Sequence, residues 1–309
     1  ARLTSIFATF RNPDKETVLT PWRVVNMHLS DSLGGYCFMN EDFTTPIDQP
    51  RYIEHKGVTT EVFHPRSVIL DINSKSGLYP LYATYSIYRK RIEEAREKYG
   101  EINRSAALML WDRTLEENIF VVCKTPMARY ITMRTLRGFR NVVVHAKDYP
   151  NLIENITSQP DSVVNMLRSG KKFWKINNDE NMKIDAIIGN PPYQLTVAKK
   201  DTENGQKAVV NIFQHFQILA DNLASRFSSL IYPGGRWIHR SGKGLADFGY
   251  KQINDVRLAR LHFFPDSTDI FQDVGIADGL SIVFKDRVKI RGGFTYAYSK
   301  RGETREVLM

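Results

Sequence analysis

Cysteine and histidine are scarce in this chain of 309 residues, which holds two cysteines, Cys37 and Cys123, and seven histidines. Two thiols cannot form a framework of disulfides, and neither residue type occurs at the spacing of metal ligands. We therefore expect no metal site. The lack of disulfides is typical of a reducing compartment, which predicts a cytoplasmic location.

Long apolar runs are also missing. No run approaches the ~18 residues that cross a bilayer, and no basic-then-apolar leader begins the sequence. With 42% hydrophobic and 25% charged residues, the chain has the composition of a soluble globular protein with one large domain or two ordinary ones. We expect no membrane partner.

Positive charge is in excess. Lysine and arginine number 43 against 34 aspartates and glutamates, which gives a net charge of +9. Such an excess favours polyanionic partners, because binding to a phosphate backbone releases counterions. The composition therefore favours nucleic acid as the partner.

Strand-like and helix-like segments alternate from residue 67 onward. The strand-like segments are short apolar runs, at residues 67–72, 118–122, 141–146, 183–189, 227–233, 256–264, 280–286 and 293–299. The helix-like segments lie at residues 78–99, 126–136 and 208–226. This order predicts an α/β fold with a doubly wound, mostly parallel sheet of the Rossmann-like type, in which ligands bind at the carboxyl ends of the strands.

The first 66 residues lack this alternation. Residues 20–35 predict a short helix ended by glycines, whereas residues 36–66 contain three prolines and predict irregular structure. We expect residues 1–66 to form an N-terminal extension that packs on the cofactor pocket of a domain spanning residues 67–309.

The stretch "DAIIGNPPYQ" at residues 185–194 has an unusual composition for the end of a buried strand. Pro191 and Pro192 have no N–H and hold the residues before them in extended geometry. The side-chain oxygen of Asn190 and the carbonyl of Pro191 can then point the same way, while Tyr193 can stack on a planar group. Two such acceptors suit a planar exocyclic amine, because they stabilise the positive charge that develops when the nitrogen is methylated.

This stretch resembles the fourth motif of the amino-group DNA methyltransferases, specifically the N6-adenine enzymes of restriction-modification systems whose cofactor-binding half precedes the catalytic half. Other stretches follow that family's order, at residues 16–28, 67–77, 141–149, 228–248 and 266–286. The resemblance implies methyl transfer from S-adenosylmethionine to N6 of an adenine flipped out of double-stranded DNA.

The resemblance also implies which residues form the site. The catalytic residues would be Asn190, Pro191, Pro192 and Tyr193. The residues against the cofactor would be Thr20, Pro21, Asp71, Gly77, Cys123 and Asp148. Phe271 would line the pocket of the flipped base, and Lys199 and Lys200 would contact DNA phosphate.

Two motifs depart from the family pattern. Ile72 and residues 74–76 occupy a turn where a proline and a second glycine are usual, and Cys123 stands where a carboxylate usually binds the ribose hydroxyls. These departures leave open a methyltransferase-like subunit that binds nucleic acid as a scaffold with little or no catalysis. Methylation of a protein glutamine or of RNA is a third hypothesis, which the segments at 228–248 and 266–286 disfavour.

The sequence disfavours two further sites. Asp48, Glu54 and Lys56 have the residue types of a metal-dependent nuclease, but we expect their region to lack a strand that would hold the acids. Cys123 is better explained as a buried core thiol than as a nucleophile, because no histidine or asparagine is arranged to activate it.

The resemblance uses almost the whole chain and leaves only residues 287–309 beyond it. Specific reading of the major groove needs a separate surface, on the order of 1,000 Å² or more. We therefore expect the recognition part, and a nuclease if there is one, to be linked or separate parts missing from this chain. DNA binding by residues 1–309 alone should then be weak, indifferent to sequence and sensitive to salt.

Overall fold

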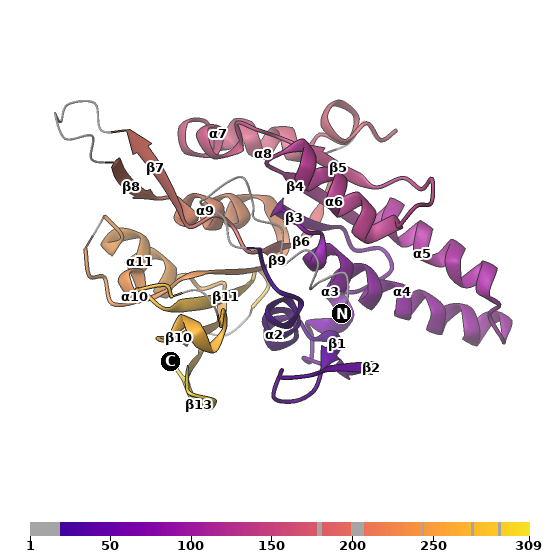
Figure 1. Cartoon of the computed structure of the whole chain (residues 1–309), viewed down its shortest axis with the longest axis horizontal. Coiled ribbons are helices and arrows are strands. Elements are labelled where there is room, and N and C mark those ends of the chain that lie inside the picture. The colour runs from indigo at the N-terminus through magenta and orange to yellow at the C-terminus, as the bar shows by residue number, and fades with distance from the viewer. Residues whose placement is uncertain (1–18, 178–180, 199–206, 243, 273–274, 290–291) are drawn as a thin grey trace.

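The computed structural model describes residues 19–177, 181–198, 207–242, 244–272, 275–289 and 292–309, and these fold around a nine-stranded sheet (Figure 1). The strand order is β13-β12-β10-β11-β9-β6-β3-β4-β5. The strands are β3 (Ile69–Ser74), β4 (Ile119–Cys123), β5 (His145–Asp148), β6 (Ile184–Gly189), β9 (Ala224–Pro233), β10 (Leu258–Phe264), β11 (Leu280–Asp286), β12 (Thr295–Lys300) and β13 (Glu303–Leu308).

The half of the sheet from β5 to β9 is entirely parallel. Beyond β9, β11 and β13 run antiparallel to their neighbours, whereas β10 and β12 pair in parallel. The chain starts this half at β3, proceeds outward to β4 and β5, and then returns to place β6 on the other side of β3. Such a reversal opens a crevice at the carboxyl ends of β3 and β6, where doubly wound folds bind ligands.

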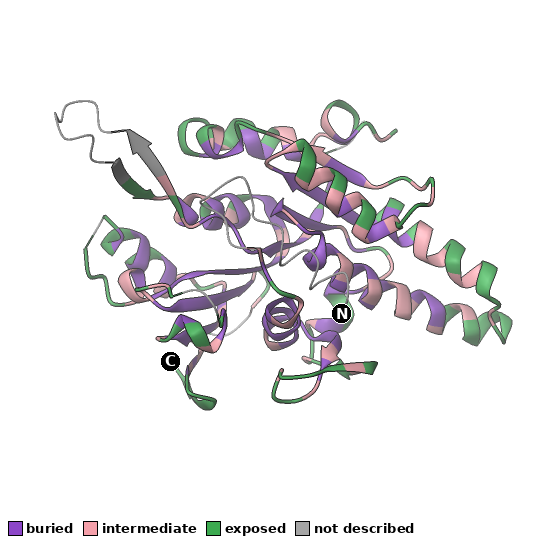
Figure 2. Ribbon diagram, in the orientation of Figure 1, coloured by how far each residue is buried: buried purple, intermediate pink, exposed green. Residues whose placement is uncertain are grey.

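Helices cover both faces of the sheet, and the buried residues concentrate between the layers (Figure 2). One face packs against α2 (Trp22–Ser32), α4 (Leu78–Tyr99), α5 (Arg104–Asn118) and α6 (Pro126–Arg137). The other packs against α7 (Leu152–Ser158), α8 (Pro160–Arg168), the π-helix η1 (Gly170–Trp174), α9 (Phe213–Leu223), α10 (Gly235–Ile238) and α11 (Ala246–Ile253). Alternation along β3 sends Leu70 and Ile72 to this second face and Ile69 to the first. No helix in the described ranges is both long enough and apolar enough to span a bilayer.

The segment after α2 is regular, and the expectation of irregular structure there is wrong. Strands β1 (Gly35–Met39) and β2 (Pro46–Ile53) form an antiparallel hairpin, followed by α3 (Thr59–Val62). The prolines are tolerated because β2 pairs only with β1 and is therefore an edge strand. Asp48 thus lies on a strand after all, but it is exposed, as are Glu54 and Lys56.

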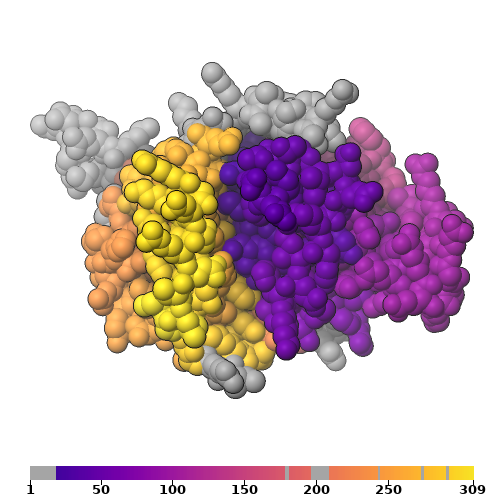
Figure 3. All heavy atoms as spheres, turned by 90° about the horizontal axis from the view of Figure 1, so that it is seen from below, coloured from indigo at the N-terminus to yellow at the C-terminus, as the bar shows by residue number. Residues whose placement is uncertain are grey.

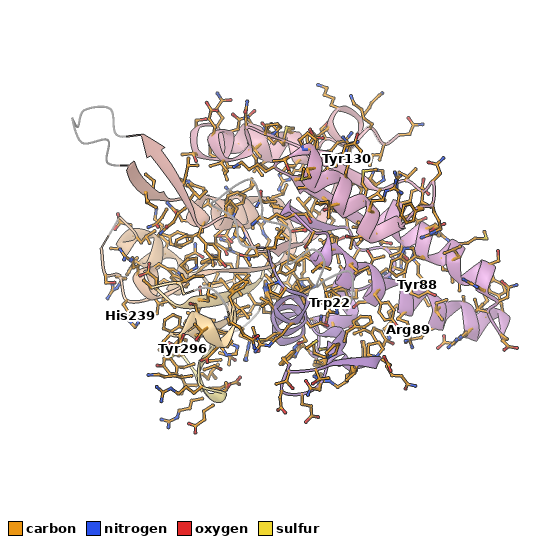
Figure 4. All side chains as sticks on the ribbon, in the orientation of Figure 1. Trp22, Tyr88, Arg89, Tyr130, His239 and Tyr296 are labelled. Atoms are coloured by element: carbon orange, nitrogen blue, oxygen red, sulfur yellow. The ribbon has the colours of Figure 1, made fainter. Side chains whose placement is uncertain are left out.

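Aromatic contacts join this hairpin to α4. The guanidinium carbon of Arg89 lies 4.6 Å from the centre of the Tyr36 ring, and the Tyr36 hydroxyl donates to Glu93 Oε1 at 2.7 Å. Figure 4 shows Arg89 and Tyr88 on α4 beside the hairpin, with Trp22 at the start of α2. Trp22 contacts Tyr82 of α4, with ring centres 6.3 Å apart. The first helix and the hairpin are therefore packed on the same face of the sheet as α4.

The two ends of the described chain lie side by side in Figure 3, where the indigo and yellow segments border a hollow. A groove of about 760 Å³ separates them, between α2 and the hairpin on one side and β10, β12 and β13 on the other. An ion pair crosses it: Arg260 donates two hydrogen bonds to Asp31, at 2.8 and 3.0 Å, and a third to Glu306 at 2.7 Å. Burial would raise the pKa of Asp31, but its contacts with His262 and Arg260 lower it below its usual range.

Three expected elements differ from those observed. Residues 208–226 were expected to be one helix, but β8 (Lys207–Asn211) precedes α9 and β9 follows it at once, because the β-branched Val209 and Val210 pair across a ribbon with β7 (Gln194–Ala198). The strand expected at 141–146 begins only at His145, where pairing with Phe120 of β4 starts. No helix was expected between the strands at 141–146 and 183–189, but residues 152–174 contain α7, α8 and η1.

Candidate functional site

The end of β3 breaks the regular ladder of the sheet. Pairing with β4 shifts between Ile72 and Ser74, and Asn73 adopts a left-handed backbone with φ of 70°. Asparagine tolerates this conformation better than most residues. The break turns the chain toward α4, which begins after Gly77, and leaves the side chains of Asp71, Asn73 and Ser74 buried at the carboxyl edge of the sheet.

Across the crevice, β6 ends at Gly189 and places Asn190 opposite β3. The Asn190 side chain is 8% exposed, and its Nδ2 donates to Thr20 Oγ1 at 2.9 Å. Its Oδ1 is buried without a hydrogen-bond partner among the described residues. The threonine therefore fixes the amide in one orientation and leaves the acceptor oxygen free, at the residue where the sequence predicted a catalytic acceptor.

The residues after Asn190 form a stiff exit from the sheet. Pro191 and Pro192 are buried, and Tyr193 is partly exposed as a residue but has a buried hydroxyl that has no partner within the described part of the chain. Burial raises the pKa of Tyr193 above its usual range, and the nearby Asn190 amide lowers it in part. The carbonyl of Tyr193 accepts from the Ile212 backbone N–H at 3.0 Å, which anchors the base of the β7–β8 ribbon beside this motif.

One small cavity joins the two strand ends. Its described lining residues are Thr20, Asp71, Asn73, Ser74, Lys75, Ser76, Leu78, Tyr79 and Asn190. The cavity measures about 20 Å³, which is room for roughly one water molecule. A larger ligand therefore requires some of the lining side chains to move. The structure brings together three residues that the sequence assigned to the site, Thr20, Asp71 and Asn190.

Asp71 is the acidic group of this cavity. It is 2% exposed, and burial raises its pKa from 3.8 to about 7, although a hydrogen bond from Ser74 and the charge of Lys75 act in the opposite direction. Its Oδ1 comes so close to the backbone of β6 that a Cβ on Gly189 would lie 2.8 Å from it. Glycine at this position, with φ of 146°, is what lets the carboxyl lie against the neighbouring strand.

The wall behind the cavity is a buried polar network. Tyr79 of α4 and Nδ1 of His28 are hydrogen-bonded at 2.7 Å, and Nε2 of the same ring meets Ser229 Oγ at 2.9 Å. Burial lowers the pKa of His28 to about 3, so its ring is neutral. This network ties α2, α4 and β9 together behind Thr20.

Gly77 and Pro21 occupy the N-cap positions of two helices. Gly77 has φ of 76° at the N-cap of α4, and a Cβ there would lie 2.9 Å from Thr132 Cα of α6. Pro21 is the N-cap of α2, and its carbonyl accepts from the Val25 N–H at 3.1 Å. Both lie beside residues of the cavity without lining it themselves.

Cys123 and Asp148 end the next two strands along the same edge. Cys123 is fully buried, as the sequence predicted, and its thiol lies 3.9 Å from Thr132 Oγ1. Burial raises the pKa of that thiol to about 12. Asp148 is partly exposed and pairs with Arg129 of α6 at 2.9 Å. The carboxylate usual at the position of Cys123 is thus replaced by a neutral side chain that points into the core.

The remaining predicted residues lie apart from the cavity. Phe271 is 3% exposed and packs in the apolar cluster between the sheet and α2, so a base would contact it only if that cluster opened. Lys199 and Lys200 lie outside the described residues. Sequence reasoning missed Asn73, whose signal was an amide at the end of an apolar strand, within the turn that departs from the family pattern.

Comparison with known proteins gives a consistent result. Residues 117–271, just over half of the chain, match the Eco57I restriction-modification methylase family. A curated relative from Mycoplasma pneumoniae, described as an uncharacterized adenine-specific methylase, is 27% identical over an alignment of 165 residues. The alignment covers 49% of this chain and 38% of the relative.

Two solved structures share the fold. The modification subunit of a putative type I restriction enzyme from Vibrio vulnificus YJ016 gives a TM-score of 0.51 at 14% identity, over 94% of this chain and 49% of that one. A DrdV–DNA complex gives a TM-score of 0.53 at 12% identity, over 99% of this chain and 32% of that one. The chain therefore spans less than half the length of each of these three relatives.

The fold and the family predicted from the sequence are both confirmed. The sheet is mostly parallel and doubly wound, with the α/β architecture of the restriction-modification methyltransferases. Motif order and the family match agree. The chain belongs to the Eco57I restriction-modification methylase family.

Proposed function

We propose that this chain transfers a methyl group from S-adenosylmethionine to N6 of an adenine in double-stranded DNA, as the methylating part of a restriction-modification system. The observation that carries the proposal is Asn190, with its Oδ1 buried and unpaired and its Nδ2 held by Thr20. A buried acceptor without a partner is costly, and such a group is retained where a ligand supplies the missing hydrogen bond.

The acceptors of the motif suit an exocyclic amine. Asn190 Oδ1 and the Pro191 carbonyl would accept from its two N–H groups, drawing its lone pair out of conjugation, and the ring of the partly exposed Tyr193 would stack on the base. S-adenosylmethionine, when bound, would supply an electrophilic methyl carbon, and its sulfur would keep the electron pair of the broken S–C bond and leave as S-adenosylhomocysteine. The amine nitrogen gains the methyl group and releases one proton to solvent, so the chain needs no general base.

The residues around the cavity fit the cofactor at its amino-acid end. Asp71 would accept from the ammonium group, and Thr20 would hold the catalytic amide beside it. Asp148 would accept from the adenine amino group of the cofactor after exchanging its contact with Arg129. Pro21, Gly77 and Cys123 would contribute backbone and packing.

The partner in this proposal is DNA. The net charge of +9 favours a polyanion. The β7–β8 ribbon projects from the body of the molecule directly after Tyr193 (Figure 1), in position to follow a groove beside a base that has left the stack. Base flipping costs roughly a few kcal/mol, which contacts with Tyr193 and, after rearrangement, Phe271 would offset. Lys199 and Lys200 remain proposed phosphate contacts, and recognition or nuclease parts remain proposed partners.

A second function is favoured by one observation. Cys123 is neutral and buried, and Asp148 is paired, so the residues at the adenosine end are already engaged. A scaffold subunit that binds nucleic acid without catalysis would have this arrangement.

Substitution of Asn190 by alanine distinguishes the two. We expect transfer of labelled methyl from S-adenosylmethionine to unmodified genomic DNA to fall at least ~100-fold, since a preorganised acceptor of developing charge is lost, while the cofactor dissociation constant changes by less than about threefold. The matched control is Asn177→Ala, an exposed asparagine remote from the crevice, which should keep wild-type activity. The labelled product should be N6-methyladenine.

Methyl transfer by Asn190→Ala at the wild-type rate would refute the catalytic assignment. A wild-type protein that binds no S-adenosylmethionine at millimolar concentration would favour the scaffold.

A further inference from the structure

Asn73 is a second buried amide in the same cavity. It is 4% exposed, and its Nδ2 has no hydrogen-bond partner among the described residues. It lines the cavity together with Asp71 and Asn190. This N–H donor has no partner in the described part of the chain, and it belongs to a residue that lines the space a ligand would enter.

The backbone gives Asn73 its position. The left-handed φ of 70° and the shift in pairing at this residue take it out of the ladder of β3, so its side chain leaves the alternating pattern of the strand. Alanine or a β-branched residue would be strained there, whereas glycine would not. The position therefore combines a conformation that asparagine tolerates with a donor that nothing else in the described structure uses.

The cavity thus holds one unused donor next to one acidic acceptor. Asp71 is two residues before Asn73, and both lie at the carboxyl edge of β3. A donor and an acid side by side complement a zwitterion, whose carboxylate needs donors and whose ammonium needs acceptors.

We propose that Asn73 is a cofactor-binding residue, whose Nδ2 donates to the carboxylate of the amino-acid end of S-adenosylmethionine. The inference rests on the proposed function, and it assigns to this chain a carboxylate-binding side chain in the turn where its sequence departs from the family pattern. Asp71 accepts from the adjacent ammonium group, and the pair distinguishes the whole cofactor from analogues that lack either charge.

The test compares three ligands by calorimetry. S-adenosylhomocysteine has both charges, decarboxylated S-adenosylmethionine lacks only the carboxylate, and 5′-methylthioadenosine lacks the amino-acid end. The variants are Asn73→Gly, which fits the backbone, and Asn73→Asp, which repels a carboxylate. The control is Arg301→Gly, since Arg301 also has a positive φ, of 53°, but lies in an exposed turn away from the cavity.

Asn73→Gly should weaken binding of S-adenosylhomocysteine about tenfold or more, as expected for a hydrogen bond to a charged group, and change binding of the other two ligands less than about twofold. Asn73→Asp should weaken S-adenosylhomocysteine further and tighten the decarboxylated ligand, since a second carboxylate faces its ammonium. With saturating cofactor, the kcat of Asn73→Gly should equal that of wild type while the KM for cofactor rises.

Three results would overturn the inference. Asn73→Gly binding all three ligands like wild type shows that the amide makes no ligand contact, and an equal loss for all three shows a structural role. The third result applies if neither variant folds. In that case, equal affinity of the wild-type protein for S-adenosylmethionine and its decarboxylated form would overturn the inference. Failure of wild type to bind any cofactor would instead refute the proposed function itself, and the inference with it.

Discussion

Replacement of Asp71 by asparagine tests whether this carboxyl is held in a site that disfavours its charge. Asparagine keeps the shape of the protonated acid and cannot ionise. The pKa of Asp71 is raised from 3.8 to about 7, mainly by burial, while Ser74 and Lys75 oppose the rise. The buried Tyr79 and Cys123 also interact electrostatically with this carboxyl, and both are neutral at pH 7 because burial raises their pKa.

The sign and size of the effect follow from the pKa. Because the folded pKa lies above the unfolded one, the folded protein binds more protons between pH 4 and 7, and wild type loses stability as the pH rises through that range. The change from 3.8 to about 7 corresponds to about 4 kcal/mol at most. Asp71→Asn does not lose this free energy. The free energy of unfolding of the variant should therefore rise relative to that of wild type up to about pH 7, and the difference between the two should stay constant above it.

Urea unfolding of both proteins without cofactor, at half-unit steps from pH 4.5 to 8.5, measures this directly. Other titrating groups contribute equally to both proteins and cancel in the difference between the two free energies of unfolding. Parallel curves would refute the reasoning, since they would show that Asp71 titrates near its ordinary pKa and is hydrated. A difference that shrinks as the pH rises would show that Asp71 is stabilised as an anion.

Two further substitutions address the same edge of the sheet. Gly189→Ala should lower the free energy of unfolding by about 2 kcal/mol or more, because the new Cβ would lie 2.8 Å from Asp71 Oδ1. The control Gly57→Ala, at φ of 76° with open space around it, should cost only the backbone strain of about 1 kcal/mol. Equal losses of the two variants in urea unfolding would contradict the proposed clash. Cys123→Asp should lower the free energy of unfolding by roughly 3 kcal/mol or more, because a buried charge near Asp71 would replace the fully buried thiol. Cys123→Ser is the milder control. If Cys123→Asp keeps wild-type stability and binds adenosine more tightly, the position still accepts a ribose-binding acid.

The sequence predicted the elements whose signal is local. Residues 78–99 were expected to be a helix, and α4 has those bounds. The buried strands were recognisable because continuous apolar runs such as "DAIIG" lie between polar turns. The order of these elements was sufficient for the fold, since few topologies arrange alternating strands and helices around one sheet.

Elements that depend on partners far along the chain were not predictable in this way. The β1–β2 hairpin contains prolines that a central strand would exclude, and only its edge position allows them. The strand β5 begins four residues later than its apolar run suggested, because its start is set by pairing with β4. Likewise, the sequence identified Asn190 but not its contact with Thr20, which is 170 residues away.

The departures at Ile72 and residues 74–76 and at Cys123 lie at the ends of two neighbouring strands, β3 and β4. Cys123 and Asp148 are engaged by residues of α6, Thr132 and Arg129, whereas Asn73 and Asn190 at the switch point keep unpaired polar atoms. Two buried amides with an unpartnered atom among the described residues therefore face each other across the ends of β3 and β6, on the side of the methyl donor's amino-acid end in the proposed function. Under that function, binding specificity should come mainly from the charged amino-acid end, and adenosine alone should bind weakly, because Cys123 is buried and Asp148 is already paired.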